Sequence, residues 1–496
     1  MTEPVFEIEI AKPTRGARDA ATMLYRQLKA AISDGRLCAG AQLPPSRRAE
    51  SLFGVSRNTI VAVYERLWHE GHVVMRRGSG TYVAKPVSRP RSSSPSSRVR
   101  IPYAHLNDFW LRPEVRKALG FWRIAGEDAA ATRRGEVDLR AAVVDSRLFP
   151  HEVFRRAMSR QLLRLERKPA PLLSPEGDQG SHRLRAAITR HIAVTRAIVT
   201  RPEEIIVTAG AQQAFDLLAR TLVGVRGAIV AVEDPGYPPM RVAFAAAGAR
   251  LVPAPVDAEG LIVEALAADT NVICLCPSHQ FPLGAPLSSE RRKALVRFAR
   301  RHEAVIVEDD YDGEFRYEDG PLAALKAQDP EVVFHVGTFS KSMLPSLRVG
   351  FIVAPLWARA ALIAAKNCVD WHVSAPVQAG VAAFIDDGHL GRHVRRMRRI
   401  YGRRRAHLMT RLRADFAGLL APMPSAYGMH VTAEVTCGAD PEEIANALGR
   451  NNVKIHTLGR FAFERPPRPG LVFGFGVSDE AGLDRALSLL LKALGR

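Results

Sequence analysis

A lysine flanked by small hydroxyl residues is the strongest candidate for covalent chemistry in the sequence. Lys341 ends the string GTFSK, which follows the apolar run 332–336. A lysine at the end of a strand can form a Schiff base with a carbonyl compound, because the pKa of a lysine falls readily when it is buried. Arg348 follows in the same segment and offers a planar fork of donors that suits phosphate. Both residues could equally be ordinary surface charges.

Carboxylates and an aromatic ring follow two other apolar runs. The run 305–307 leads into the acidic string 308–312, and a carboxylate at a strand end can pair with a protonated ring nitrogen. The run 228–232 leads into EDPGYP, where prolines fix the ring of Tyr237 at the edge where α/β sheets bind ligands. The alternatives are a loop cap or a metal ligand for the acids and core packing for Tyr237. We predict no metal, because the nearest histidine, His302, precedes the strand.

A glycine-containing turn marks a candidate phosphate site. The run 205–208 ends at residues 209–213, which read AGAQQ and open a helix. The free backbone N–H groups and the positive dipole of a helix N-terminus suit an anion. The alternative is that the small residues only allow close packing.

Basic and hydroxyl side chains gather at a second place, near the N-terminus. Residues 56–59 read SRNT and open a helix that Ser56 can cap, and these side chains can reach bases or phosphates. Arg47 lies at the start of the preceding helix, and two arginines lie at the glycine-rich tip of a hairpin. The candidate DNA contacts are Arg47, Ser56, Arg57, Thr59, Arg76 and Arg77.

Three helices and a hairpin are expected over residues 1–85, the layout of a winged helix-turn-helix. Residues 1–100 hold 17 Lys and Arg against 8 Asp and Glu, an excess that suits a polyanion such as double-stranded DNA. The alternative is a small helical docking domain with a solvated basic rim.

Short apolar runs alternate with helical stretches from residue 138 onward. This alternation predicts an α/β domain over 138–496, built on a parallel sheet that is covered on both faces. Between the two domains, residues 86–100 hold six Ser, three Pro and four Arg and no acid. We therefore expect a linker over 86–137, although its aromatic pairs could dock onto a neighbour.

The composition excludes several classes of protein. With 47% hydrophobic and 24% charged residues in 496, the chain is not disordered throughout. It has no apolar stretch long enough for a membrane span and no secretory pattern at its start, so we expect a cytoplasmic protein. Its five cysteines have no paired spacing, which disfavours a disulfide framework or a zinc site.

The N-terminal segment resembles the GntR family of winged-helix regulators. The similarity rests on LPPSRRAESLFGVSRNTIVAVYERL and on the wing RRGSGTYV, within residues 43–83. It implies DNA contacts at Arg47, Ser56, Arg57 and Thr59.

The whole chain resembles the MocR branch of that family, in which a winged helix is fused to a fold-type-I aminotransferase domain that binds pyridoxal 5′-phosphate (PLP). The motifs occur in the order GAQQAFDLLARTL, EDPGYP, PSHQFPLG, EDDYDGEFRY, GTFSKSMLPSLRVG and HVRRMRRIYGRRR. The resemblance implies that Lys341 binds PLP covalently, Asp309 pairs with the pyridine nitrogen, Tyr311 bonds the ring hydroxyl and Tyr237 stacks on the ring. It assigns the phosphate to Ala211, Gln212, Thr338, Ser340 and Arg348. It assigns no role to Ser278 or His279.

Two departures from the family pattern concern the ligand. The family usually has Gly and Pro where this chain has Ala142 and Val144, so the chain path there could differ. Aminotransferases usually carry an arginine three residues before a late aromatic residue, where Val472 precedes Phe475 here. This departure weakens the case for ordinary amino-acid transamination and allows a ligand without a carboxylate.

These features predict a homodimeric, PLP-dependent transcription regulator that binds an operator in double-stranded DNA and senses an amine or PLP. The main alternative is a working aminotransferase with an accessory DNA-binding domain. A third possibility is a PLP-binding scaffold that does neither. Sustained turnover with a keto acid would favour the enzyme, and ligand-dependent DNA affinity without turnover would favour the regulator.

Overall fold

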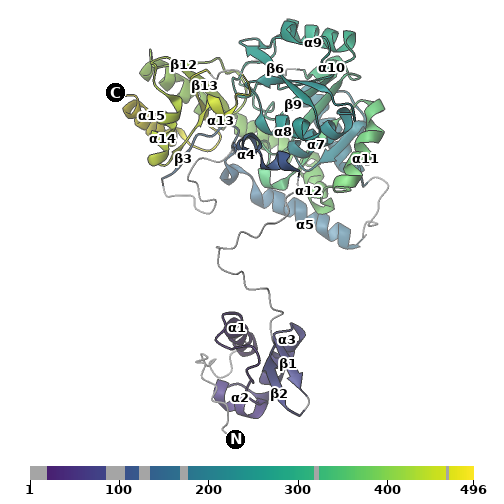
Figure 1. Cartoon of the computed structure of the whole chain (residues 1–496), viewed down its shortest axis with the longest axis vertical. Coiled ribbons are helices and arrows are strands. Elements are labelled where there is room, and N and C mark those ends of the chain that lie inside the picture. The colour runs from purple at the N-terminus through teal and green to yellow at the C-terminus, as the bar shows by residue number, and fades with distance from the viewer. Residues whose placement is uncertain are drawn as a thin grey trace. The chain divides into compact units, whose positions relative to one another are not determined.

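The chain divides into two compact units, Met1–Leu106 and Asn107–Arg496. The computed structural model describes residues 19–76, 78–84, 107–121, 135–167, 177–317, 323–464 and 468–495, and Figure 1 shows both units. Arg77 and most of the expected linker lie outside the described residues. The two units are described separately.

Unit 1 is a three-helix fold with a hairpin. Its elements are α1 (Ala20–Ser33), α2 (Ser46–Phe53), α3 (Arg57–His69), β1 (Val73–Arg76) and β2 (Gly80–Val83). Leu24, Phe53 and Ile60 are buried in its core. Gly54, with a φ of 70°, ends α2, and Ser56 caps α3 by accepting a hydrogen bond from the N–H of Thr59. This arrangement is the predicted winged helix-turn-helix.

The hairpin of unit 1 is held at its base by the chain that precedes α2. The N–H of Leu43 donates to the carbonyl oxygen of Thr81, and the N–H of Val83 donates to that of Ala41, both at 2.8 Å. Gln42 also donates its side-chain amide to the carbonyl oxygen of Ser79 at 2.9 Å. These bonds fix the wing to the helical core.

Unit 2 is built on an eight-stranded sheet. In spatial order its strands are β4 (Ile205–Thr208), β11 (Gly350–Val353), β10 (Val333–Thr338), β9 (Val305–Asp310), β8 (Val272–Leu275), β5 (Ile229–Asp234), β6 (Arg250–Asp257) and β7 (Gly260–Leu261). Each of the four apolar runs named from the sequence forms one of these strands, namely β4, β5, β9 and β10. The expectation of a purely parallel sheet is wrong, because β11 pairs antiparallel with both β10 and β4, and β7 pairs antiparallel with β6.

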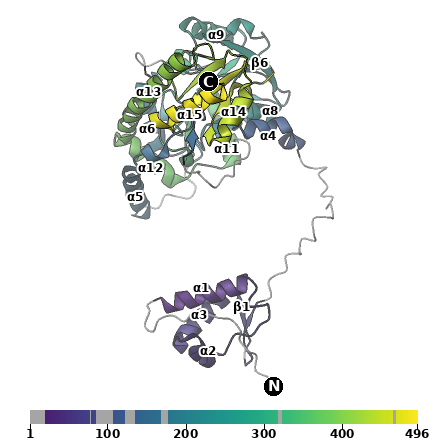
Figure 2. The same ribbon diagram turned by 90° about the vertical axis from the view of Figure 1, so that its left-hand side faces the viewer.

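Helices cover both faces of this sheet, as expected (Figures 1 and 2). One face packs against α7 (Ala211–Leu222), α8 (Pro238–Ala246) and α11 (Arg359–Val369). The other packs against α5 (His151–Arg167), α6 (His182–Arg196), α9 (Ser289–Arg301), α10 (Leu325–Gln328) and α12 (Ala375–Asp386). The period-two alternation of each strand divides its apolar side chains between the two layers.

The C-terminal part of unit 2 has its own antiparallel sheet. Its strands are β12 (Leu420–Pro422), β13 (His430–Val435), β16 (Gly470–Gly474) and β15 (His456–Thr457). The helices α13 (His389–Asp415), α14 (Pro441–Arg450) and α15 (Glu480–Ala493) belong to this part, whose yellow-green ribbons gather at one side of Figure 1. The short strand β3 (Val137–Asp138) pairs with β14 (Val453–Lys454). The start of the predicted second domain is therefore tied to its far end.

We expected a linker over 86–137, but residues 107–121 of this range belong to unit 2. They form the short helices η2 (Asp108–Leu111) and α4 (Pro113–Leu119), and α4 packs against α8. Phe121 is 2% exposed. Its ring meets that of Tyr237 edge to face at 5.4 Å between centroids. Residues 107–121 therefore pack onto unit 2 through buried apolar side chains, although the Ser/Pro/Arg-rich segment before them suggested a linker.

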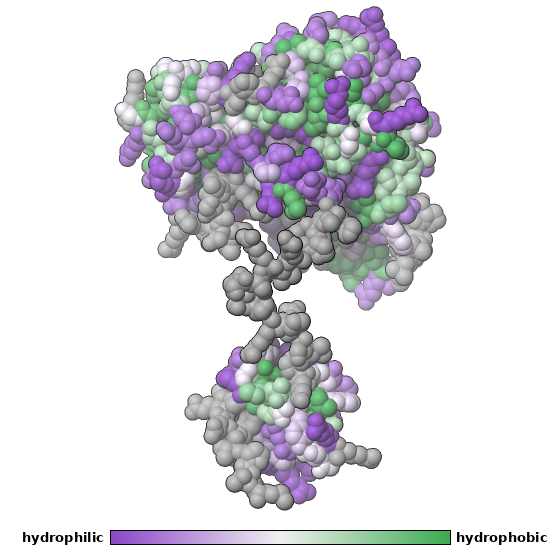
Figure 3. Space-filling view, viewed as in Figure 1, coloured by the Kyte–Doolittle hydropathy of each residue, from purple (hydrophilic) through white to green (hydrophobic). Residues whose placement is uncertain are grey.

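The surface of both units carries many hydrophilic residues on the face shown in Figure 3. Among the residues that the structure describes, no helix combines the length and the apolar character needed to cross a bilayer.

Candidate cofactor site and candidate DNA interface

A cavity of about 340 Å³ lies at the ends of the strands of the large sheet, where α/β sheets bind ligands. Its volume falls in the range of roughly 300–1,000 Å³ that is typical of small-molecule sites. Its lining includes all the residues that the sequence assigned to the cofactor, namely Ala211, Gln212, Tyr237, Asp309, Tyr311, Thr338, Ser340, Lys341 and Arg348. The lining also includes Arg140, Ala142, Val143, Phe281 and Pro345, which the sequence did not assign.

The acidic side chains at the end of β9 point to two different faces of the sheet. Glu308 accepts hydrogen bonds from His335 Nδ1 at 3.0 Å and from the N–H of Leu325 at 2.8 Å. Asp310 forms an ion pair with buried Arg196. Asp309 points to the other face and lines the cavity, and its Oδ1 has no hydrogen-bond partner among the described residues. Asp309 is therefore the carboxylate left for a ligand.

Asp309 has the electrostatic character expected of a partner for a protonated ring nitrogen. Burial, followed by the charge of Asp310, raises the pKa of Asp309 to about 7. Its Oδ2 receives only a weak contact from Cys276 Sγ, at 3.7 Å. A cationic N–H opposite this carboxylate would relieve the cost of its burial. The unpaired oxygen therefore fits the pyridine ring of PLP.

Lys341 reaches the same cavity from the loop after β10. Its Nζ donates to the carbonyl oxygen of Ala142. The side chain is partly exposed to the cavity but is removed from bulk water, and this desolvation lowers the pKa of Lys341 to about 8. A larger neutral fraction near pH 8 makes the amine a better nucleophile toward an aldehyde.

The chain path at Ala142 keeps a conformation that favours glycine. Ala142 has a φ of 58°, in the left-handed region, where a Cβ costs roughly 1–2 kcal/mol. The departure from the family's usual glycine therefore leaves alanine in a strained position beside Lys341.

The phosphate candidates surround the N-terminus of α7. Gly210 precedes this helix with a φ of 82° and no side-chain cap, so the first N–H groups of α7 are open to a ligand. Arg348 Nη2 donates to the carbonyl oxygen of Ala209 at 3.0 Å, and a Cβ on Gly210 would come within 2.6 Å of that nitrogen. Thr338 Oγ1 and Ser340 Oγ lie 3.0 Å apart at the same cavity. This donor set fits a phosphate.

Aromatic rings form another part of the wall. Tyr237 meets Phe281 edge to face at 5.9 Å and Phe121 at 5.4 Å between centroids. Phe121 belongs to one of the aromatic pairs that could dock onto a neighbour, although the sequence did not assign it to this cavity, whereas Phe281 lies inside the quoted string PSHQFPLG. Val472 is fully buried in a cluster with Tyr237, Phe281 and Tyr311. A buried valine therefore stands at the position where aminotransferases usually carry an arginine.

One group of described side chains could offer ligand atoms to a metal ion, namely His279, Asp312 and His430. His279 Nδ1 lies 3.1 Å from Asp312 Oδ2, and His430 Nε2 donates to the carbonyl oxygen of Pro282 at 2.9 Å. A Cβ on Gly428 would overlap the ring of His279. Two of the donor atoms are thus engaged in hydrogen bonds, and backbone fills the space beside them.

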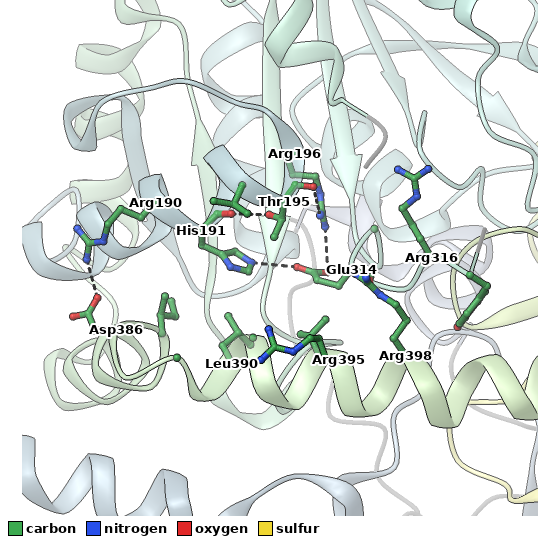
Figure 4. Close-up of a pocket in the computed structure, with 17 residues that line it drawn as sticks. Arg190, His191, Thr195, Arg196, Glu314, Arg316, Asp386, Leu390, Arg395 and Arg398 are labelled. Carbon is green, nitrogen blue, oxygen red and sulfur yellow. Dashed lines mark hydrogen bonds and ion pairs between the residues drawn. The ribbon is translucent and has the colours of Figure 1, made fainter. Parts of the chain in front are cut away.

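A second cavity, of about 910 Å³, lies between α6, α12 and α13. Figure 4 shows several arginines around it. Arg190 pairs with Asp386 at 2.8 Å, and Arg196 pairs with Asp310 and with Glu314. Arg196 helps to lower the pKa of Glu314 to about 2. The charges of Arg190 and Arg196 are therefore balanced within the protein, and none of the expected cofactor residues lines this cavity.

In unit 1, the candidate DNA contacts lie on the surface. Arg47, Ser56, Arg57 and Arg76 are exposed, and Thr59 is half-buried. Ser56 Oγ lies 2.9 Å from Thr59 Oγ1, so these two hydroxyls also stabilise the start of α3. The guanidinium of Arg76 lies over the ring of Tyr82 at 5.1 Å. The structure brings these side chains to one small fold, and Arg77 lies outside the described residues.

Comparisons with known proteins identify both units. Residues 20–83 match the family described as "Bacterial regulatory proteins, gntR family", and residues 173–455 match "Aminotransferase class I and II". The chain is 32% identical to the probable rhizopine catabolism regulatory protein MocR of Rhizobium meliloti, over 95% of this chain and 92% of that one. It is also 32% identical to the pyridoxine biosynthesis transcriptional regulator PdxR of Corynebacterium glutamicum, over 95% of each chain.

Solved structures agree with the fold of unit 2. The α-aminoadipate aminotransferase LysN of Thermus thermophilus is 26% identical, with a TM-score of 0.66 over 76% of this chain and 96% of that one. The Pyrococcus horikoshii kynurenine aminotransferase, at 24% identity, has a TM-score of 0.70 over 80% of this chain and 99% of that one. The chain belongs to the MocR branch of the GntR family of transcription regulators, in which a winged helix is joined to a fold-type-I aminotransferase domain.

Proposed function

We propose that this protein regulates transcription by binding PLP in unit 2, sensing an amine or PLP itself there, and presenting the winged helix of residues 1–85 to an operator. The observation that carries the proposal is the single cavity that holds Lys341 together with an unpaired Asp309 carboxylate. The names of two relatives, which refer to rhizopine catabolism and pyridoxine biosynthesis, support an amine or a pyridoxal compound as the effector class.

The proposed cofactor roles follow from the residues that line the cavity. PLP, when bound, supplies an aldehyde that reacts reversibly with amines. Lys341 offers the amine that holds the cofactor, Asp309 holds the proton of the ring nitrogen, Tyr311 donates to the ring oxygen and Tyr237 covers the ring. Ala211, Gln212, Thr338, Ser340 and Arg348 bind the phosphate.

The proposed DNA contacts lie around the start of α3. This helix would enter the major groove by its N-terminal end, with Ser56, Arg57 and Thr59 at bases or phosphates and with Arg47 on the backbone. Arg76 and Arg77 extend the contact from the wing. We also propose a cytoplasmic homodimer, since two winged helices suit an operator with paired half-sites.

A working aminotransferase is the second candidate, favoured by the fold of unit 2. Val472 argues against it, because a buried valine stands at the position where aminotransferases usually carry the arginine that binds a substrate carboxylate. Keto-acid-dependent turnover that persists over many cycles would favour this candidate.

A DNA titration tests the main proposal. Operator affinity is measured with and without PLP and with candidate amines, namely taurine, GABA and pyridoxal compounds. An effective amine should change affinity by roughly 5–150-fold, the usual range of coupling between two sites. The variant K341A should lose the effect of the amine even if PLP still occupies the cavity. An affinity that is indifferent to every amine that alters the PLP spectrum would overturn the sensor and favour the enzyme.

A further inference from the structure

A buried histidine touches the tyrosine that is proposed to bind the cofactor oxygen. His279 Nδ1 lies 2.8 Å from the hydroxyl of Tyr311 and 3.1 Å from Asp312 Oδ2. His279 and Asp312 are each 1% exposed, and neither lines the cavity. One nitrogen therefore faces both a hydroxyl and a carboxyl group behind the cavity wall.

The protonation state of the His279 ring determines whether Nδ1 donates or accepts a hydrogen bond, and thus how it interacts with Asp312 and Tyr311. Burial lowers the pKa of His279 to about 3, so its ring is neutral and carries a single proton. Nδ1 then offers either one N–H or one lone pair in the plane of the ring. An ionised Asp312 accepts that N–H, and a protonated Asp312 donates to that lone pair. In both cases Nδ1 is occupied, and the hydroxyl proton of Tyr311 has no acceptor there.

We propose that Asp312 is a positioning residue: it occupies Nδ1 of His279 and so keeps the hydroxyl proton of Tyr311 directed into the cavity, toward the ring oxygen of the cofactor. This inference rests on the proposed function, since it concerns the oxygen of bound PLP. If Asp312 were removed, the single proton of His279 could move to Nε2. The bare Nδ1 would then accept the Tyr311 hydroxyl proton and turn it away from the cofactor.

The surroundings hold the pair in this geometry. His279 Nε2 has no hydrogen-bond partner among the described residues. The ring proton is therefore governed by the two groups at Nδ1, the carboxyl group of Asp312 and the hydroxyl of Tyr311. The ring of His430 lies 4.6 Å from that of His279, and its Nε2–H is held by the carbonyl oxygen of Pro282. Gly428, with a φ of 74°, packs its backbone against the pair. These contacts leave the imidazole little freedom to rotate.

Other ionisable groups face the same place from several elements. They are Asp309 and Asp310 on β9, Glu233 on β5, Cys276 after β8, His430 on β13, and Lys341 after β10. Changes in their charge affect the cofactor regardless of the direction of the Tyr311 proton. A test must therefore separate the hydrogen bond from the charge of Asp312.

The test is a pH titration of the visible absorbance of PLP bound at Lys341, followed in the full-length protein. A hydrogen bond to the ring oxygen favours its anionic form and thus the unprotonated cofactor–lysine linkage, so losing that bond raises the pH midpoint. We expect D312A and Y311F each to raise it by about one unit, because a hydrogen bond to a charged group is worth about a tenfold change in equilibrium. Loss of the Asp312 charge alone would lower the midpoint, because that charge stabilises protonated Lys341.

Two further variants isolate the hydrogen bond. D312N removes the charge, but its amide can still occupy Nδ1, so its midpoint should not rise. The double variant D312A/H279F removes the competing acceptor, so it should lose the rise seen in D312A. If D312A does not fold, D312L takes its place, because it also leaves Nδ1 of His279 without its carboxyl partner. H279F is the control and should lack the rise seen in Y311F.

Several results would overturn the inference. One is a pH midpoint in D312A that is unchanged or lower than in the wild type. Another is a raised midpoint that persists in D312A/H279F. A third is a midpoint in H279F that rises as much as in Y311F. If the purified protein contained one equivalent of metal and D312A contained none, His279 and Asp312 would be ligands of a cation instead of a hydrogen-bonded pair. If the wild type forms no borohydride-reducible adduct with PLP, the proposed function fails and this inference fails with it. A normal adduct without the predicted shifts overturns this inference alone.

Discussion

The two candidate sites differ in how the chain builds them. In unit 1 the DNA candidates lie between residues 47 and 77, close together in sequence and largely exposed. In unit 2 the cofactor candidates come from the ends of strands and from the segments that follow β4, β5, β9 and β10, between residues 211 and 348, and meet in one cavity. The first site is a local motif on a small core, and the second depends on the topology of a whole sheet.

The difference extends to electrostatics. Exposed arginines such as Arg57 stay hydrated, so their binding energy appears only when a polyanion displaces water and ions. Buried groups such as Asp309 and Lys341 already have shifted pKa values before any ligand binds. Substitutions in unit 2 should therefore change both ligand binding and protein stability, whereas those on the face of unit 1 should change binding alone.

The largest expected effect is at Lys341. K341A should abolish the borohydride-reducible PLP adduct and leave operator binding by unit 1 measurable. Lys326 provides the matched control, because burial also lowers its pKa to about 8 while its Nζ bonds the carbonyl oxygen of Pro330. K326M should keep the adduct. An adduct that survives K341A would remove this lysine from the proposed site.

The next effect concerns pH and the stability of unit 2 without PLP. The pKa of Asp309 is raised to about 7 in the folded protein, against about 3.9 when unfolded. Its protonation therefore stabilises the fold fully below about pH 4, and this contribution is lost as pH rises through 7. Chemical denaturation should show that the wild type loses stability between pH 5 and pH 8, by at most about 3 kcal/mol from this group, and that D309N reduces this loss.

The same titration has an internal control. D216N makes an equal chemical change at Asp216, which forms an i,i+4 ion pair with Arg220 on the surface of α7. That variant should leave the pH dependence near that of the wild type, because surface pairs contribute about 0–1 kcal/mol. Equal slopes for the wild type and D309N would show that Asp309 is not buried as described.

A smaller effect is expected on the face of unit 1. R57A should weaken operator binding by about 1–3 kcal/mol and relax specificity at one position if Arg57 contacts a base, or weaken binding to all sequences if it contacts phosphate. R36A is the matched control, since Arg36 is exposed but paired with Asp34 at 2.8 Å. Fluorescence anisotropy at fixed salt measures both. Equal affinity of R57A and the wild type would exclude Arg57 from the interface, and neither variant should change the stability of unit 2.

The smallest effect is expected at Ala142. A142G should relieve the cost of a Cβ at a φ of 58° and stabilise unit 2 by up to about 1 kcal/mol, less the entropy that glycine adds to the unfolded chain. The neighbouring variant A141G should destabilise it, because Ala141 is buried without a positive φ. Urea denaturation measures the free energy of unfolding of both variants. A lower stability of A142G than of the wild type would show that Ala142 is not strained.

Sequence reasoning reached local features better than long-range ones. The cap at Ser56 and the strand that carries Asp309 follow from local patterns of three to six residues. The antiparallel strand β11 was not predicted, because an apolar run carries no sign of its direction. Phe121 and His279 were also missed as parts of the site. Their roles depend on contacts with Tyr237 and Tyr311, which lie far away in the chain.

The contact between Phe121 and Tyr237 also brings the first described segment of unit 2, residues 107–121, next to the proposed cofactor site. This segment, which follows unit 1 in the chain, packs beside Tyr237, the ring proposed to cover the cofactor. Because protein interiors tolerate few voids, a ligand that tilts Tyr237 must shift Phe121 or leave a gap beside it. A change in the ligand would therefore reach residues 107–121, the described part of unit 2 that precedes its large sheet in the chain, through the contact between Tyr237 and Phe121.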